Sequence, residues 1–176
     1  MKVSDPVLID RMRKNGIVNP RLTLQAARKA KLPIAVACAF LEQESSGGQN
    51  IFGHDRNTIF AGAGPVTEAK YREYKKQRGP TGKGGMQGVG PMQLTFFSLQ
   101  DRADELGGCW KPLHNMTVGF QHAADLIRRQ GLRLGIKAYN GSGPDADKYA
   151  EHMLSLIRKW EQALGTPETA PHHAKA

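Results

Sequence analysis

The chain has 176 residues, of which 39% are hydrophobic and 23% charged, and its formal net charge at pH 7 is +9. This length favours a single globular domain with a proper core, and the absence of any apolar run near the roughly 20 residues of a bilayer span excludes membrane insertion. The positive charge indicates a polyanionic partner, such as nucleic acid, anionic lipid or a bacterial wall, and we expect no signal peptide because the N-terminus has no apolar stretch.

Two helices are predicted before the centre of the chain. Residues 5–15 have an amphipathic pattern that Gly16 ends. The Asn19-Pro20 pair is a typical start of a second helix, which continues to Ala30.

The most informative stretch is residues 33–48, where every residue from Ile34 to Leu41 is apolar. A helix that is apolar on all sides belongs in the middle of a domain. Its last turn carries Glu42 and Glu44 before two serines and two glycines stop it. A carboxyl that a buried helix brings to the surface is partly desolvated and lies at the negative end of the helix dipole. Both effects favour the protonated form that a general acid needs, although a solvated glutamate pair is the alternative.

After Gly48 the helical pattern of the sequence ends. Ile51, Phe52, Ile59 and Phe60 lie among turn-forming residues, which predicts a short β-hairpin or irregular ribbon. Residues 66–78 are a charged helix candidate. Six glycines and two prolines between residues 79 and 91 predict a long mobile loop.

Helical patterns return at 96–106, 113–130, 132–139 and 145–163. We therefore expect one mainly helical domain over residues 1–164 and a flexible linker or tail over residues 165–176. Such a tail suggests that the chain is one module of a longer protein.

Of three further stretches, the first precedes the predicted helix at 66–78 and the second overlaps the end of the predicted loop. Asp55, within Phe-Gly-His-Asp-Arg, is a candidate second carboxylate that faces Glu44, or else part of an Asx-turn. In Gly-Val-Gly-Pro-Met-Gln-Leu-Thr the glycines allow the backbone to approach a ligand, and Gln93 has an amide that can recognise one. The alternative is a flexible loop that ends in Thr95 as a helix N-cap.

The third stretch is Ala-Tyr-Asn-Gly-Ser-Gly. Tyr139 and Asn140 are suited to reach a polar substrate, but Asn-Gly is also an ordinary helix end. The histidines lack metal-ligand spacing. Cys38 and Cys109 form no metal motif, and they are expected to be free buried thiols, with a single bridge as the alternative.

The order of these pieces resembles the goose-type lysozymes and soluble lytic transglycosylases over roughly residues 30–160. A core helix that ends in Glu-Ser comes first, then a Gly-x-Gly-x-Met-Gln loop, then a helix that ends in Ala-Tyr-Asn-Gly. The resemblance implies a mainly α, lysozyme-like α+β domain with a small β-hairpin along one wall of a substrate groove. It makes Glu44 the catalytic acid and Asp55 the residue that positions water. The substrate-binding residues that we assign with it are Ser45, His54, Met92, Gln93, Thr95, Tyr139 and Asn140.

Two features depart from the family pattern. Leu94-Thr95 stands where goose-type lysozymes have another aspartate, and the segment from about residue 56 to 85 is longer than the usual connection. The first departure affects the positioning of water, and the second affects the shape of the groove.

The resemblance implies cleavage of the β-1,4 bond between N-acetylmuramic acid and N-acetylglucosamine in peptidoglycan. The nucleophile is either a water held by Asp55 or the 6-hydroxyl of the muramic acid, which gives a 1,6-anhydro product. No metal or organic cofactor is implied. We expect a monomeric bacteriophage endolysin, made in the host cytoplasm and then released to the anionic cell wall. The contrasting class, a basic nucleic-acid-binding module, is supported by charge alone.

Overall fold

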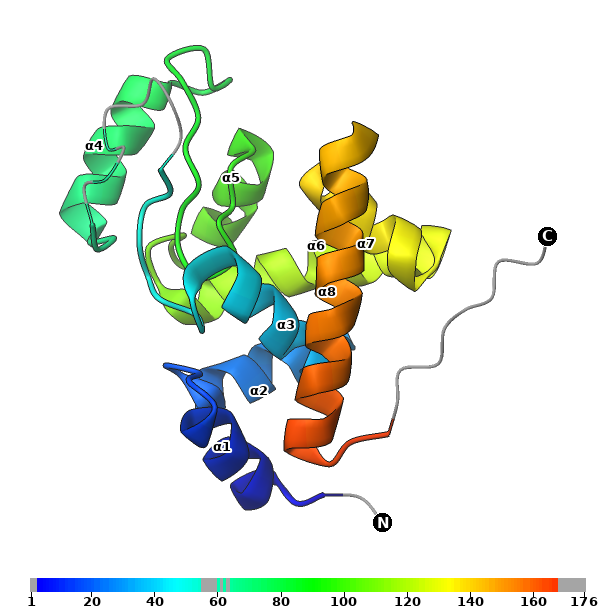
Figure 1. Ribbon diagram of the computed structural model, residues 1–176. Helices are drawn as coiled ribbons and strands as arrows, with labels where there is room; N and C mark the ends of the chain where they lie inside the picture. The colour runs from blue at the N-terminus through cyan, green and yellow to red at the C-terminus, as the bar shows by residue number, and fades with distance from the viewer. Residues whose placement is uncertain (1–2, 55–59, 61, 63, 168–176) are drawn as a thin grey trace.

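The computed structural model describes residues 3–54, 60, 62 and 64–167, and these residues form eight helices (Figure 1). Longer segments join α3 to α4 and α4 to α5, and short turns join the others. The mainly helical architecture is as predicted, and the helix bounds differ from the predicted ones by three residues or fewer. The helices are α1 Asp5–Lys14, α2 Pro20–Ala30, α3 Ile34–Ser45, α4 Glu68–Arg78, α5 Phe97–Leu106, α6 Pro112–Gln130, α7 Leu132–Asn140 and α8 Gly143–Leu164.

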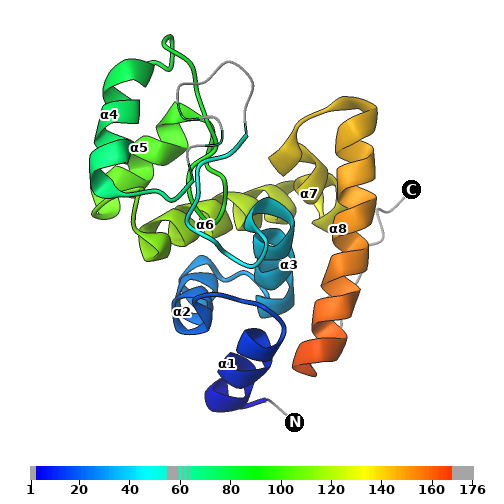
Figure 2. The ribbon, with the colours of Figure 1, turned by 60° about the vertical axis from the view of Figure 1, so that its left-hand side comes forward.

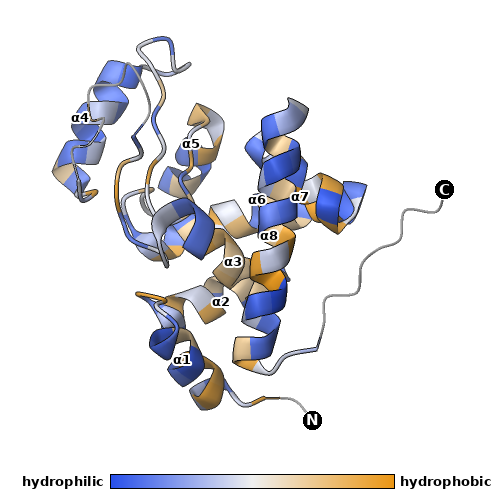
Figure 3. Cartoon of the chain, viewed as in Figure 1, coloured by the Kyte–Doolittle hydropathy of each residue, from blue (hydrophilic) through white to orange (hydrophobic). Residues whose placement is uncertain are grey.

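Helix α3 is the centre of the molecule. All residues from Ala35 to Leu41 are buried, and α3 packs against α2 and α8 (Figures 1 and 2). In Figure 3 the helix is hydrophobic along most of its length and turns hydrophilic in its last turn. This placement follows from the apolar run, because such a helix has no polar side to expose to water.

The end of α3 is fixed by a close approach to the α1–α2 turn. Ser46 adopts the left-handed conformation, and the Gly47 amide donates to the Leu41 carbonyl at 2.9 Å. A Cβ at Gly47 would lie 2.1 Å from the Gly16 carbonyl oxygen, so only glycine fits there. The Gly47 carbonyl in turn accepts from the Val18 amide at 2.9 Å. The last turn of α3 therefore has a defined position.

Helices α4, α5, α7 and α8 form two sides around α3 and α6 (Figure 1). Helices α4 and α5 lie on one side and α7 with the first half of α8 on the other, while α6 packs against both α5 and α7 (Figure 1). Helix α8 packs against α3 and α7, and it buries one face made of Ala146, Ala150, Met153, Ile157 and Trp160. None of the described helices is both long and apolar enough to cross a membrane.

The predicted β-hairpin is wrong for the described residues, where pairing is limited to isolated bridges between Ile51 and Pro65, Phe52 and Val89, and Val89 and Leu94. Segment 50–53 lies between 64–66 and 88–90 as an irregular ribbon. The Phe52 amide donates to the Gly64 carbonyl, and the Gly53 amide donates to the Gly88 carbonyl. Because consecutive residues pair with different segments, neither pairing extends into a β-ladder. Pro65 has no amide to donate, and the glycines weaken strand formation.

The stretch 79–91 is not one open loop. Residues 87–91 are buried and belong to the ribbon, whereas residues 79–86 are exposed or half-buried. The Gln87 amide donates to the Tyr74 hydroxyl at 2.9 Å, and the Gly90 amide donates to the Ile51 carbonyl at 2.9 Å. Both cysteines are free and buried, which excludes a bridge between them, and burial raises the pKa of both thiols, that of Cys109 to about 12.

Candidate active site

Glu44 lies in the last turn of α3, where α8 passes close by. Its side chain is half-buried, and the Tyr149 hydroxyl of α8 donates to Glu44 Oε1 at 2.5 Å. The buried helix therefore brings the Glu44 carboxyl to α8, where Tyr149 is its defined partner.

Burial raises the pKa of Glu44, and the hydrogen bond from Tyr149, which favours the ionised form, partly offsets this. The raised pKa increases the protonated fraction near neutral pH. A carboxyl in this state is able to donate a proton to a bound substrate, which is the property expected of a general acid.

Tyr139, near the end of α7, binds the ribbon and is affected by the charge of Glu44. Its hydroxyl donates to the Met92 carbonyl at 2.9 Å, and its ring lies 4.8 Å from that of Phe40. Burial and the negative charge of Glu44 both raise the pKa of Tyr139, so its hydroxyl stays protonated. Tyr139 and Tyr149 thus approach Glu44 from two different helices.

Ser45 and Met92, which were predicted to bind substrate, have buried side chains. The Ser45 hydroxyl donates to the Pro91 carbonyl at 2.6 Å and joins α3 to the ribbon. The backbone carbonyl of Met92 accepts from the Tyr139 hydroxyl. The structure therefore gives both residues a supporting role in the wall of the site instead of a surface for a ligand.

Gln93 also stabilises the ribbon. It has a positive φ of 47°, and its side-chain amide donates to the carbonyls of Ile51 at 3.0 Å and Gly90 at 2.9 Å. Thr95 is exposed and donates to the Gln93 carbonyl at 3.2 Å. It is not the N-cap of α5, because Phe96 holds that position.

Two further predicted residues are exposed: His54 on the ribbon and Asn140 at the end of α7. Asn140 precedes Gly141, whose amide donates to the Lys137 carbonyl at 2.9 Å and ends the helix as the Asn-Gly pattern predicts. Asp55 lies outside the described residues.

Tyr149 was not assigned to the site from the sequence, although a signal was available. It lies three residues after Ala146 and four before Met153, both of which are buried, so helical spacing puts it on the inner face of α8. A tyrosine on such a face carries a hydroxyl that needs a partner, and here the partner is Glu44.

No described residues form a group of three or more His, Cys, Asp or Glu side chains suited to a metal ion. The chain matches no protein-family model, no curated protein and no solved structure. The case for its function therefore depends on the geometry around Glu44 and on the resemblance of its motifs.

Proposed function

We propose that the chain is a lysozyme-like glycosidase that cleaves the β-1,4 bond between N-acetylmuramic acid and N-acetylglucosamine in peptidoglycan. The observation that supports this most is the half-buried Glu44 carboxyl, which has a raised pKa and a hydrogen bond from Tyr149. The order of the Glu-Ser, Met-Gln and Tyr-Asn motifs resembles that in goose-type lysozymes and soluble lytic transglycosylases, and this resemblance indicates the substrate class.

In this proposal protonated Glu44 donates its proton to the leaving glycosidic oxygen. The carboxylate that remains keeps the hydrogen bond from Tyr149, which stabilises the charge that forms during the reaction. Tyr139 holds the ribbon against the site through the Met92 carbonyl. No step requires a metal or an organic cofactor.

The nucleophile in this proposal is a water activated by Asp55. An inverting reaction needs a second carboxylate about 6.5–9.5 Å from the acid, because the water must fit between them. Asp55 directly follows the described part of the ribbon at His54, which is why we assign it this role.

Transglycosylation is the second candidate, and one observation favours it. Burial and the Tyr149 hydroxyl account for the shift in the pKa of Glu44, and no second carboxylate of the described residues contributes to it. Glu44 alone would then act first as acid and later as base toward the muramic 6-hydroxyl, giving a 1,6-anhydro product.

The biological role that fits this chemistry is that of a bacteriophage endolysin, a monomer that acts on peptidoglycan strands in an anionic wall. It would be made in the host cytoplasm and reach the wall after release. The nucleic-acid-binding alternative is supported only by the net charge of +9, and it predicts no change in purified walls.

Mass spectrometry of purified peptidoglycan after incubation with the chain tests the proposal. We expect soluble muropeptides with reducing N-acetylmuramic acid ends, and we expect Asp55→Asn to lose most activity while Thr95→Ala loses less. Products with a 1,6-anhydro ring, together with a fully active Asp55→Asn variant, would establish transglycosylation instead. No soluble fragments at all would reject the glycosidase.

A further inference from the structure

A cavity lies where the turn between α2 and α3 meets the last turns of α6. Its volume is about 630 Å³, within the range of pockets that bind small molecules. The cavity adjoins the start of α3, whereas Glu44 lies in the last turn of that helix. A helix rises about 1.5 Å per residue, so about 16 Å of helix separates the cavity from Glu44. The cavity is therefore distinct from the candidate active site.

Most of the cavity lining is apolar, and it comes from both sides of the α2–α6 contact. Leu32 is buried, while Ala124 and Ile127 of α6 are half-buried and pack against the core on one side only. The apolar lining residues are Ala30, Leu32, Pro33, Ala124 and Ile127. Moving an alkyl chain from water onto such a surface is favourable, so the cavity suits one.

Two exposed cationic side chains, Lys31 and Arg128, complete the lining. Among the described residues, Lys31 has no ion-pair partner. Arg128 donates to Asp125 at 2.8 Å, which uses only part of the donor capacity of its guanidinium. With the Asp125 carboxylate already bound, the charge beside the apolar lining is positive.

The backbone at Lys31 gives this lysine no local reason. Lys31 has a φ of 55° and ends α2 in the left-handed conformation. Glycine or asparagine is the usual residue at such a position. The conformation therefore does not account for the lysine, whereas a role for its charge at the cavity would.

We propose that this cavity binds a single-chain amphiphile with an anionic head group, such as a fatty acid. The alkyl chain would lie against the apolar lining, and the carboxylate would lie beside Lys31 and Arg128. This site does not depend on the proposed function. A second copy of the chain would bring a further charge of +9 to a cationic site, and a phosphodiester polymer would leave the apolar lining unused. Charge and lining together therefore favour the amphiphile.

Calorimetric titration of the full chain with decanoate and with decanol tests this. We expect one decanoate to bind, and decanol to bind about tenfold more weakly because the charge-assisted hydrogen bond is lost. Nonanoate should bind about fourfold more weakly than decanoate, since it buries one methylene less.

Three variants separate the two parts of the site. Lys31→Gln should weaken decanoate binding about tenfold and leave decanol binding unchanged. Lys29→Gln is the matched control, because Lys29 is an exposed lysine outside the cavity lining, and it should bind decanoate as the wild type does. Ala124→Leu fills the cavity and should abolish binding of both ligands.

Decanoate binding that does not saturate at one site, or that Lys29→Gln weakens as much as Lys31→Gln, would overturn the proposal, because either result indicates attraction to the net charge alone. Lys31→Gln and Ala124→Leu variants that stay folded in thermal unfolding and bind decanoate like the wild type would also overturn it.

Discussion

Glu42 and Glu44 lie two residues apart on α3, and their carboxylates meet different partners. Glu42 accepts from the Lys159 ammonium at 2.7 Å and from the Trp160 indole N–H at 2.7 Å, which joins α3 to α8. Among the described residues, the hydrogen-bond partner of the Glu44 carboxyl is the neutral Tyr149 hydroxyl, and burial raises the pKa of Glu44. One carboxylate is thus paired with a cation across to α8, and the other, with its raised pKa, is available as an acid.

The Tyr149→Phe substitution should shift the pH dependence of the proposed reaction. The Tyr149 hydroxyl lowers the pKa of Glu44, so its removal raises that pKa further. The proposed reaction needs protonated Glu44, so activity should be lost as pH rises through the pKa of Glu44. The alkaline limb of the pH–rate profile should therefore move to higher pH. The rate at pH values below this limb should fall about tenfold, because the developing carboxylate loses a hydrogen bond.

Tyr139→Phe is the control for this measurement, since it removes a hydroxyl that bonds Met92 and not Glu44. It should lower the rate without moving the alkaline limb upward. An alkaline limb that stays in place in Tyr149→Phe would show that this hydrogen bond does not control the acid.

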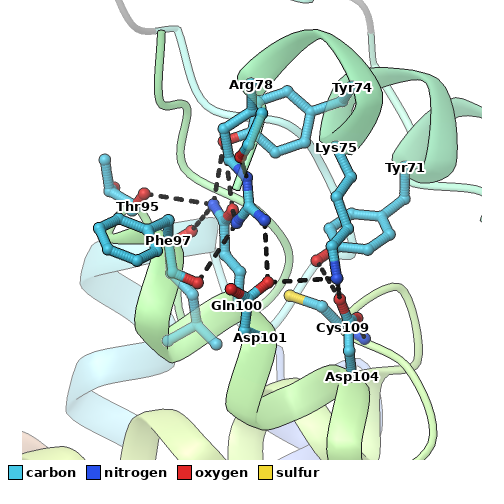
Figure 4. Close-up of polar contacts among 12 residues, drawn as sticks. Tyr71, Tyr74, Lys75, Arg78, Thr95, Phe97, Gln100, Asp101, Asp104 and Cys109 are labelled. Atoms are coloured by element: carbon cyan, nitrogen blue, oxygen red, sulfur yellow. Dashed lines mark hydrogen bonds and ion pairs between the residues drawn. The ribbon is translucent and has the colours of Figure 1, made fainter. Parts of the chain in front are cut away.

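Among the elements, α4 is joined to α5 by a buried polar network (Figure 4). Gln100 is its centre: its amide donates to the Leu94 carbonyl at 2.7 Å and to the Gln87 carbonyl at 3.0 Å, and its oxygen accepts from Arg78 at 2.7 Å. The Arg78 side chain is fully buried and also binds Asp101 at 2.8 Å. The network therefore holds both ends of the ribbon segment that contacts Ser45 and Tyr139.

Gln100→Ala should destabilise the fold by about 2–4 kcal/mol, because it leaves the buried Arg78 guanidinium without one acceptor and several carbonyls without a donor. Urea unfolding measures this. Gln25→Ala on the exposed face of α2 is the matched control and should stay within about 0.5 kcal/mol. A Gln100→Ala variant as stable as the control would show that α4 is attached in another way.

The sequence predicted the elements that have clear local signals. Pro20 and Pro112 lie at helix starts, Gly16 and Gly141 follow helix ends, and the apolar run before Glu42 gives the buried α3. The ribbon was predicted less well because its hydrogen bonds join segments far apart in the chain, such as Gly53 with Gly88.

The candidate site was also predicted only in part, because some of its contacts join parts of the chain that are far apart in sequence. Glu44 and Tyr139 lie within motifs, whereas the partner of Glu44 on α8 comes from a helix about 100 residues later. The buried side chains of Ser45 and Met92 are likewise consequences of tertiary packing that local patterns do not contain.

The net charge of +9 should increase the association of the protein with an anionic wall. Helix α4 is hydrophilic along its length in Figure 3, and residues 70–83 carry six basic side chains. Attraction between exposed charges weakens as salt rises, since the Debye length falls to about 8 Å near physiological ionic strength. The rate on intact walls should therefore fall as salt rises from low values, while thermal stability changes little.

Turbidity of intact walls measures that rate, and cleavage of short soluble muropeptides at the same salt concentrations is the control, because it needs little long-range attraction. A rate on intact walls that does not depend on salt would show that the charge serves a different partner.

In the proposed mechanism Glu44 donates the proton in glycan cleavage. The most direct test compares Glu44→Gln with Glu42→Gln on purified peptidoglycan, with circular dichroism to confirm that both variants are folded and mass spectrometry to quantify the products. A general acid contributes about 10²–10⁴-fold to the rate, so Glu44→Gln should lose at least a hundredfold, and Glu42→Gln should retain most activity. A folded Glu44→Gln variant with more than a tenth of the wild-type rate would contradict the account.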